Sequence, residues 1–174
     1  AFLDQDGTSL HNAMVWLDER AANEVGGLCE VLGGEKIHKI SGKPIDPTPV
    51  LYRLKWLSNN KPEVLEKTHR ILDVQGYLVF RLTGTAKTSW TSADPFGTFD
   101  IQKKVWSSTL LDQVGVRTDQ FPEALCPGEE IGKISEKIAS EFNLPMNLKI
   151  YAGGGDGQCA GLGVNAIAGG RAYL

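Results

Sequence analysis

Residues 148–164, LKIYAGGGDGQCAGLGV, carry the strongest structural signal in the sequence. The apolar run at 148–152 predicts a buried strand, the three glycines after it predict a loop, and Gln158 to Gly163 predicts the start of a helix. Glycines have no Cβ atom, so a ligand can approach this backbone closely. Asp156 then sits at the start of the helix, where the amide dipoles favour an ionised carboxylate.

Two interpretations of Asp156 are open at this point. A carboxylate at the carboxyl end of a strand lies where ligand crevices form in α/β sheets, and there it can accept a proton from a hydroxyl that attacks a phosphoryl group. Phosphoryl transfer depends mainly on positioning and charge stabilisation, so one orienting carboxylate is enough on the acceptor side. Alternatively, Asp156 caps a helix after a tight turn, because Gly-Asp-Gly turns are common.

The rest of the sequence predicts two sheet-rich ends with a helical middle. Residues 1–17 predict a β-hairpin whose second strand is Ala13–Trp16. Helices are predicted from residue 21 to Gly33, from Val50 to residue 58, over 62–67, from Val74 to Leu82, over 106–114 and over 136–142, and Gly84 is expected to end the fourth of them. Further strands are predicted over 132–134 and 170–174. We therefore expect a hairpin and a helix at 1–40, a mainly helical region at 41–120 and a sheet-rich region at 121–174.

Trp16 is the second candidate functional residue. It ends the strand predicted at Ala13–Trp16 and is followed by a charged segment. A tryptophan in that place offers an apolar wall to the carbon face of a sugar, and its N–H can donate to a hydroxyl. Asp18 or Arg20 can bond further hydroxyls. The alternative is a core tryptophan beside a surface charge cluster.

Composition and charge are typical of a soluble globular domain, with 41% hydrophobic and 22% charged residues among 174. The net charge of −3, without a basic stripe, argues against nucleic acids and anionic membranes as partners. The apolar stretches fall short of the ~20 residues that a membrane span requires. Three scattered cysteines, and three histidines without ligand spacing, predict no disulfide scaffold and no metal site, and reduced thiols predict a cytoplasmic protein.

Both ends of the sequence fall within predicted strands, at Ala1–Leu3 and at Gly170–Leu174. A sheet cut at both edges would leave backbone groups unpaired. We therefore expect the sequence to be part of a longer protein.

The segment DQDGT at 4–8 resembles the DxDGT motif of haloacid dehalogenase-type phosphatases, in which the first aspartate, here Asp4, is the nucleophile. That motif normally follows a fully buried strand and precedes a long loop or a cap domain. Here another predicted strand follows within five residues, so a hairpin turn is the simpler explanation. A phosphatase that uses Asp4 is kept as an alternative function.

Several segments together resemble the FGGY carbohydrate kinases, in the order in which they occur in that family. They are NAMVWLDERA at 12–21, SG at 41–42, the stretch 44–57 ending in LKWL, DVQGYLVFRLTG at 73–84, FD at 99–100 with Trp106, Leu110 and Leu111, the segment 128–134, and GGGD at 153–156. The resemblance covers nearly the whole sequence, and its last segment is similar to the one that bears the catalytic aspartate of the family. It therefore favours Asp156 as a catalytic base over a capping residue.

The resemblance implies an α/β fold of the ribonuclease H-like, actin-like ATPase type, incomplete here and with a helical insertion in the middle. It implies ATP-dependent phosphorylation of a sugar or polyol hydroxyl with Mg²⁺ bridging the phosphates, and a homodimer as a further expectation. The residues expected at the site are Asp156 as the catalytic base, Trp16, Asp18, Thr48 and Gln158 for the substrate, and Gly154 and Gly155 for the cofactor. Within the family the sequence resembles xylulokinases, so a pentulose such as xylulose is the favoured substrate.

The sequence departs from the family pattern in several places. The two phosphate loops and the adenine-binding second domain of the family would lie before Ala1 and after Leu174, so we expect part of a sugar pocket and no ATP site. Arg53 stands where many members have lysine, and TSADP at 91–95 differs from the usual S-D/N-A-S. Gluconate- and glycerol-type kinases therefore stay open, as does a sugar-binding module without catalysis.

Overall fold

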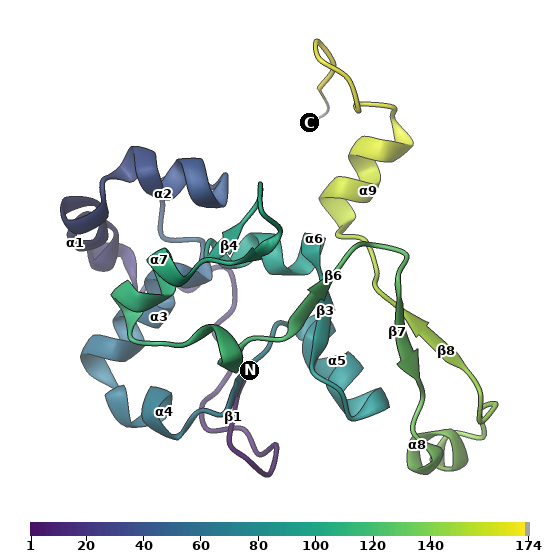
Figure 1. The fold of residues 1–174 in the computed structure, drawn as a ribbon. Helices are drawn as coiled ribbons and strands as arrows, with labels where there is room; N and C mark the ends of the chain where they lie inside the picture. The colour runs from purple at the N-terminus through teal and green to yellow at the C-terminus, as the bar shows by residue number, and fades with distance from the viewer. Residues whose placement is uncertain (173–174) are drawn as a thin grey trace.

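Figure 1 shows the computed structural model, which describes residues 1–172. The helices are α1 (Ala22–Leu32), α2 (Gly34–Ser41), α3 (Val50–Asn60), α4 (Pro62–Lys67), α5 (Val74–Thr83), α6 (Trp90–Ala93), α7 (Ser108–Leu111), α8 (Glu136–Glu141) and α9 (Asp156–Gly163), with 3₁₀ turns at Asp94–Phe96, Asp112–Val114 and Thr118–Gln120. The strands are β1 (Phe2–Leu3), β2 (Arg70–Ile71), β3 (Lys87–Ser89), β4 (Phe99–Asp100), β5 (Val105–Trp106), β6 (Glu123–Leu125), β7 (Glu130–Lys133) and β8 (Lys149–Tyr151). None of the described helices has both the length and the apolar character to span a bilayer.

Helix α3 lies in the main hydrophobic core, which occupies the helical side of the molecule (Figure 1). Leu51, Leu54 and Leu57 recur at helical spacing along α3, and none of them is exposed. They belong to one buried cluster with Leu28 of α1 and Leu110 of α7. The predicted helix with one buried face is therefore confirmed.

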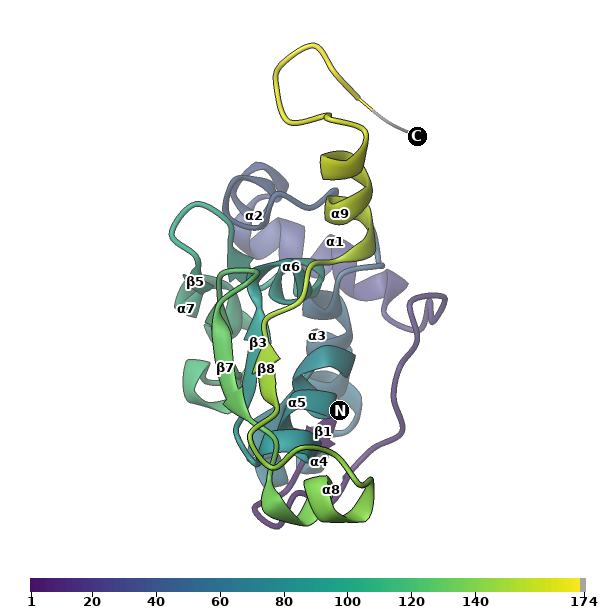
Figure 2. The same cartoon turned by 90° about the vertical axis from the view of Figure 1, so that its right-hand side faces the viewer.

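The strands are short and pair two by two. β1 pairs with β2, β4 with β5 and β7 with β8 in antiparallel fashion, whereas β3 and β6 are parallel. Helix α5 lies between the helical side and the β7–β8 pair (Figure 1), and α8 and α9 lie at opposite ends of that pair (Figure 2). A smaller apolar cluster of Val79, Ile131 and Ala152 joins α5 to β7 and to the residue that follows β8.

The hairpin predicted at residues 1–17 is wrong. Phe2 and Leu3 pair with Ile71 and Arg70 of β2, and no strand occurs between residues 11 and 17. A single bridge joins Leu3 to Ser9. The apolar pattern was recognised, but the partner of β1 comes from a segment about seventy residues further along the chain, which no local pattern reveals.

Two predicted helix ends are confirmed by their backbone geometry. Gly33 follows α1 with a φ of 82°, and Gly84 follows α5 with a φ of 79°. This region of φ is strained for side-chain-bearing residues and accessible to glycine, which makes glycine a frequent helix terminator.

The two strands expected near the C-terminus differ from the prediction. β8 forms as expected but is not buried, since Lys149 and Tyr151 are exposed and Ile150 is half-buried. The strand expected at Gly170–Leu174 is absent over residues 170–172, and its last two residues lie outside the described part of the chain.

Candidate active site

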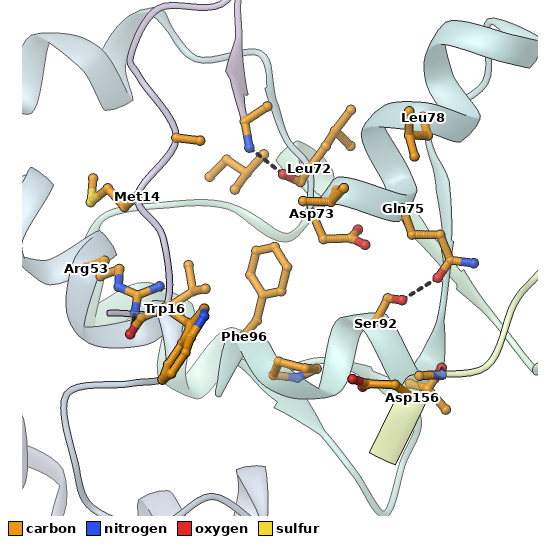
Figure 3. Close-up of a pocket in the computed structure, with 18 of the residues that line it drawn as sticks. Met14, Trp16, Arg53, Leu72, Asp73, Gln75, Leu78, Ser92, Phe96 and Asp156 are labelled. Carbon is orange, nitrogen blue, oxygen red and sulfur yellow. Dashed lines mark hydrogen bonds between the residues drawn. The ribbon is translucent and has the colours of Figure 1, made fainter. Parts of the chain in front are cut away.

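A cavity of about 950 Å³ lies between the N-terminal segment, α3, α5, α6 and the glycine loop (residues 153–155). Apolar residues such as Leu72 and Phe96 form much of its wall (Figure 3). The residues with polar side-chain atoms on this wall are Trp16, Arg53, Asp73, Gln75, Thr91, Ser92, Asp156 and Gln158. An apolar cavity with a few converging polar groups is the usual form of a small-molecule site.

Asp156 is the first residue of α9, and its side chain lies on the wall of this cavity (Figure 3). Gly155 occupies the N-cap position, so Asp156 is not the residue that caps the helix. Its Oδ1 accepts a hydrogen bond from the N–H of Gly157 at 2.9 Å. The carboxylate is exposed, so a ligand in the cavity can reach it.

Trp16 lies on the same cavity wall as Asp156 (Figure 3). It belongs to a segment without regular structure, and 72% of the residue is exposed. The alternative of a core tryptophan is therefore wrong. An exposed indole on a cavity wall offers an apolar face and an N–H donor to a ligand.

Arg53 of α3 was not among the predicted site residues, but it lies on the cavity wall beside Trp16 (Figure 3). Only 4% of Arg53 is exposed, and its Nη2 donates to the main-chain oxygen of Trp16 at 3.1 Å. Burial lowers the pKa of Arg53, and the nearby Asp18 carboxylate opposes that shift. The sequence feature that could have identified Arg53 as a site residue is the presence of an arginine on the apolar face of a predicted helix.

Asp73 is a second carboxylate on the cavity wall, and Figure 3 shows it pointing into the cavity. Its Oδ1 is buried without a hydrogen-bond partner. In the same wall Ser92 donates to Oε1 of Gln75. Sequence reasoning missed all three residues, because an aspartate before a helix resembles an ordinary N-cap and a serine and a glutamine carry no distinctive pattern.

Three of the other predicted residues line the cavity and two do not. Gly154, Gly155 and Gln158 are on its wall, and Nε2 of Gln158 donates to Asp94 at 3.4 Å. Asp18 and Thr48 are not on that wall. Asp18 forms an ion pair with Arg20 at 2.8 Å, and the exposed Thr48 donates its N–H to Oδ1 of Asp46 at 2.8 Å. The roles of Asp18 and Thr48 stay predictions.

The glycine loop is closely approached by side chains of the chain itself. A Cβ on Gly154 would lie 2.5 Å from Sγ of Cys159, and one on Gly155 would lie 2.3 Å from Oε1 of Gln158. The φ of Gly155 is −67°, which any residue can adopt. A side chain at either position would therefore displace the side chain of Cys159 or of Gln158.

The geometry of the described residues assigns no contact to a nucleotide or to a metal ion. Within residues 1–172, no group of three or more His, Cys, Asp or Glu side chains is arranged to hold a metal ion. The N–H of Gly155 donates to Oγ1 of Thr91 at 2.9 Å, so this amide is not directed at a phosphate. Contact of Gly154 and Gly155 with a cofactor stays a prediction.

Asp4, the nucleophile of the phosphatase alternative, is not on the cavity wall. Its Oδ1 accepts from the N–H groups of Asp6 at 3.0 Å and Thr8 at 2.8 Å, so the carboxylate stabilises its own turn. The geometry does not favour a phosphatase that uses this residue.

Comparison with known proteins identifies a family. The sequence profile of the N-terminal domain of the FGGY family of carbohydrate kinases matches residues 1–163. L-Fuculokinase from Escherichia coli K12 is 30% identical over 166 residues, which are 95% of this chain and 35% of the relative. The solved structures of a gluconate kinase and a ligand-bound xylulose kinase from Lactobacillus acidophilus each superpose with a TM-score of 0.88 and 30% identity, over 95% of this chain and 34% of theirs.

These similarities confirm the α/β, ribonuclease H-like fold class that the resemblance implied. The chain spans about a third of the length of the relatives it matches. The similarities to carbohydrate kinases do not favour the two alternative functions, which are a phosphatase that uses Asp4 and a sugar-binding module without catalysis.

Proposed function

The chain belongs to the FGGY family of carbohydrate kinases, and from this premise we propose that the protein containing it transfers a phosphoryl group from ATP to a hydroxyl of a sugar or polyol. In this proposal the cavity holds the sugar and Asp156 is the catalytic base. The observation that carries it is the presence of Trp16 and Asp156 on the wall of one cavity, although 140 positions separate them in the sequence.

Asp156 acts on the acceptor hydroxyl. As the hydroxyl oxygen attacks the phosphoryl group, its proton passes to the carboxylate, which makes the oxygen a better nucleophile. The carboxylate needs to be ionised beforehand in order to accept this proton. Bound ATP would supply the phosphoryl group and Mg²⁺ would neutralise its charge, but no contact to either is assigned to residues of this chain.

The other wall residues orient the sugar. The indole of Trp16 covers an apolar carbon face, and the carboxylate of Asp73, which Figure 3 shows pointing into the cavity, accepts hydrogen bonds from hydroxyls. Arg53 supplies positive charge beside Trp16. Gln158 is a further substrate candidate, because it lines the cavity two residues after Asp156.

We propose a pentulose such as xylulose as the first substrate to test. A xylulose kinase is among the similar structures, but a gluconate kinase superposes equally well and L-fuculokinase is a similar relative. A substrate panel therefore has to include a pentulose, a hexulose, an aldonate and a polyol. The cytoplasmic location and the homodimer also stay predictions.

Replacement of Asp156 by asparagine in the intact protein tests this function. Loss of a general base predicts a fall in kcat of about 100-fold to 10,000-fold, measured as ADP release with the best sugar of the panel. Asp4→Asn is the matched control, since asparagine can accept the same two backbone hydrogen bonds in the turn and Asp4 is not on the cavity wall. Turnover by Asp156→Asn at the rate of the control would refute the assignment.

A further inference from the structure

We propose that Thr91 is the positioning residue of the glycine loop, and that its hydroxyl holds Asp156 in place for proton transfer. The inference rests on the proposed function, in which Asp156 is the base. It adds a residue that does not itself take part in the chemistry but acts through the backbone next to Asp156.

The hydroxyl of Thr91 connects both sides of Gly154. Its Oγ1 accepts a hydrogen bond from the N–H of Gly155 at 2.9 Å and donates to the carbonyl oxygen of Gly153 at 3.3 Å. Both glycines are more than sixty positions away in the sequence, so these bonds join the loop to α6. Gly155 directly precedes Asp156, so the position of the Gly155 backbone determines where the side chain of Asp156 starts from the chain.

One assignment of the protons gives the Thr91 hydroxyl a full set of partners, and in it Ser89 donates to Thr91 and not to Oε1 of Gln75, which lies 3.2 Å from the Ser89 oxygen. Because the Thr91 hydroxyl donates to Gly153, the 2.7 Å contact with Oγ of Ser89 requires Ser89 to donate to Thr91. Ser89 in turn accepts from the N–H of Ser92 at 3.2 Å, and Ser92 donates to Gln75. The single proton and both acceptor positions of the Thr91 hydroxyl are then used, which is the arrangement that holds a hydroxyl most firmly.

Within the described part of the chain, the side-chain hydrogen bonds to the glycine loop come from Thr91. Before the loop, Ala152 is buried against Val79 and Ile131. After the loop, α9 has Gly161 as its buried residue, so the helix that begins with Asp156 is weakly packed against the rest of the described chain. Three consecutive glycines have unusual backbone freedom, which leaves the Thr91 hydroxyl to limit their conformations.

A second contact from the same segment also supports a role of α6 in positioning Asp156. Asp94, which follows α6, accepts from Nε2 of Gln158 at 3.4 Å and forms an ion pair with Lys43 at 2.5 Å. The segment from Thr91 to Asp94 therefore contacts the chain both before and after Asp156. This places the carboxylate relative to α6 and not only relative to β8.

The test compares side chains at position 91 that differ in the hydroxyl. In the intact protein, Thr91→Ser keeps the hydroxyl, whereas Thr91→Ala and Thr91→Val lack it, and Ser and Ala differ in that group alone. Thr98→Val is the control, because the Thr98 side chain is buried and its Oγ1 has no hydrogen-bond partner, so the same substitution removes no bond there. The measurements are kcat and KM for the sugar, and the thermal unfolding midpoint.

We expect kcat to fall by about 10-fold to 100-fold in Thr91→Ala and Thr91→Val, because small displacements of a catalytic group have effects of this size. KM should change by less than about threefold, Thr91→Ser should keep kcat within about threefold, and in a background of Asp156→Asn the removal of the hydroxyl should cause no further loss. Equal kcat values for Thr91→Ser and Thr91→Ala would overturn the inference. So would a rise in KM alone, which would indicate direct substrate contact, or a fall in kcat explained by unfolding at the assay temperature.

The outcomes separate this inference from the proposed function. If Asp156→Asn keeps full turnover, the proposed function fails and the positioning role fails with it. If Asp156→Asn is inactive while Thr91→Ala is fully active, the base is retained and the positioning role alone is refuted.

Discussion

Nη2 of Arg53 lies 3.1 Å from the main-chain oxygen of Trp16, and this hydrogen bond joins α3 to an irregular segment 37 positions earlier. Arg53 is nearly fully buried, and its Nε has no hydrogen-bond partner. A buried cation with an unsatisfied donor costs stability. Packing alone therefore does not explain why an arginine occupies this buried position in the cavity wall.

Replacement of Arg53 by methionine should affect stability and substrate binding in opposite directions. The unfolding midpoint should stay the same or rise, because well-packed apolar residues often replace buried charges without loss. KM for the sugar should rise by about tenfold, since the hydrogen bond of a charged donor that holds Trp16 is lost. Arg117→Met, at an exposed ion pair with Asp119, is the control. A lower midpoint with an unchanged KM would show that Arg53 has only a structural role.

Replacement of Trp16 should act on substrate binding alone. Because 72% of Trp16 is exposed, Trp16→Ala should leave the unfolding midpoint within about 2 °C of the wild-type value. KM should rise by about 10-fold, and Trp16→Phe should recover part of the loss because it restores an aromatic face. Steady-state kinetics with the best sugar of the panel measure both. An unchanged KM in Trp16→Ala would exclude the indole as a sugar contact.

Removal of the hydroxyl of Tyr52, a residue of α3, should not lower the free energy of unfolding, which is unusual for a change to a buried aromatic residue. Its hydroxyl is buried without a hydrogen-bond partner, and burial raises its pKa to about 12. Tyr52→Phe should therefore leave the free energy of unfolding unchanged or raise it by up to about 1 kcal/mol. Leu54→Ala in the same core should lower it by about 2–5 kcal/mol, which shows that the urea unfolding measurement detects a core defect. A loss above about 1 kcal/mol in Tyr52→Phe would indicate a missed partner for the hydroxyl.

Asp100 of β4 should contribute stability that depends on pH. Its Oδ1 accepts from the N–H groups of Lys103 at 2.9 Å and Gln102 at 3.0 Å, and the hydrogen bond from Lys103 is the largest cause of its lowered pKa. Since the pKa in the folded state lies below that of the unfolded chain, the stabilisation is complete above pH of about 4 and is lost as the pH falls through the folded value.

The corresponding experiment compares wild type with Asp100→Asn in urea at several pH values. The free energies of unfolding should differ by about 1 kcal/mol at pH 7, and the difference should shrink below pH of about 4. Asp112→Asn, at an exposed position, serves as the control. A difference that is the same at both ends of the pH range would contradict the contribution of the Asp100 carboxylate.

Part of the candidate site could be predicted because it depends on local sequence. The strand, the glycine loop and the helix around Asp156 form as expected. Trp16 was among the predicted substrate-binding residues, and it lines the cavity. Arg53, Asp73 and Thr91 were missed as site residues. Each carries a side chain that is common in structural roles, and only its neighbours in space distinguish it.

The sequence by itself determined the helices with one apolar face, such as α3, and the ends of α1 and α5, because helical periodicity and glycine backbone freedom act over a few neighbouring residues. Only the tertiary structure decided that β1 pairs with β2, and that Trp16 and Asp156 share a cavity. Those relationships join residues far apart in the chain, and they arise from the packing of whole elements, which local patterns do not specify.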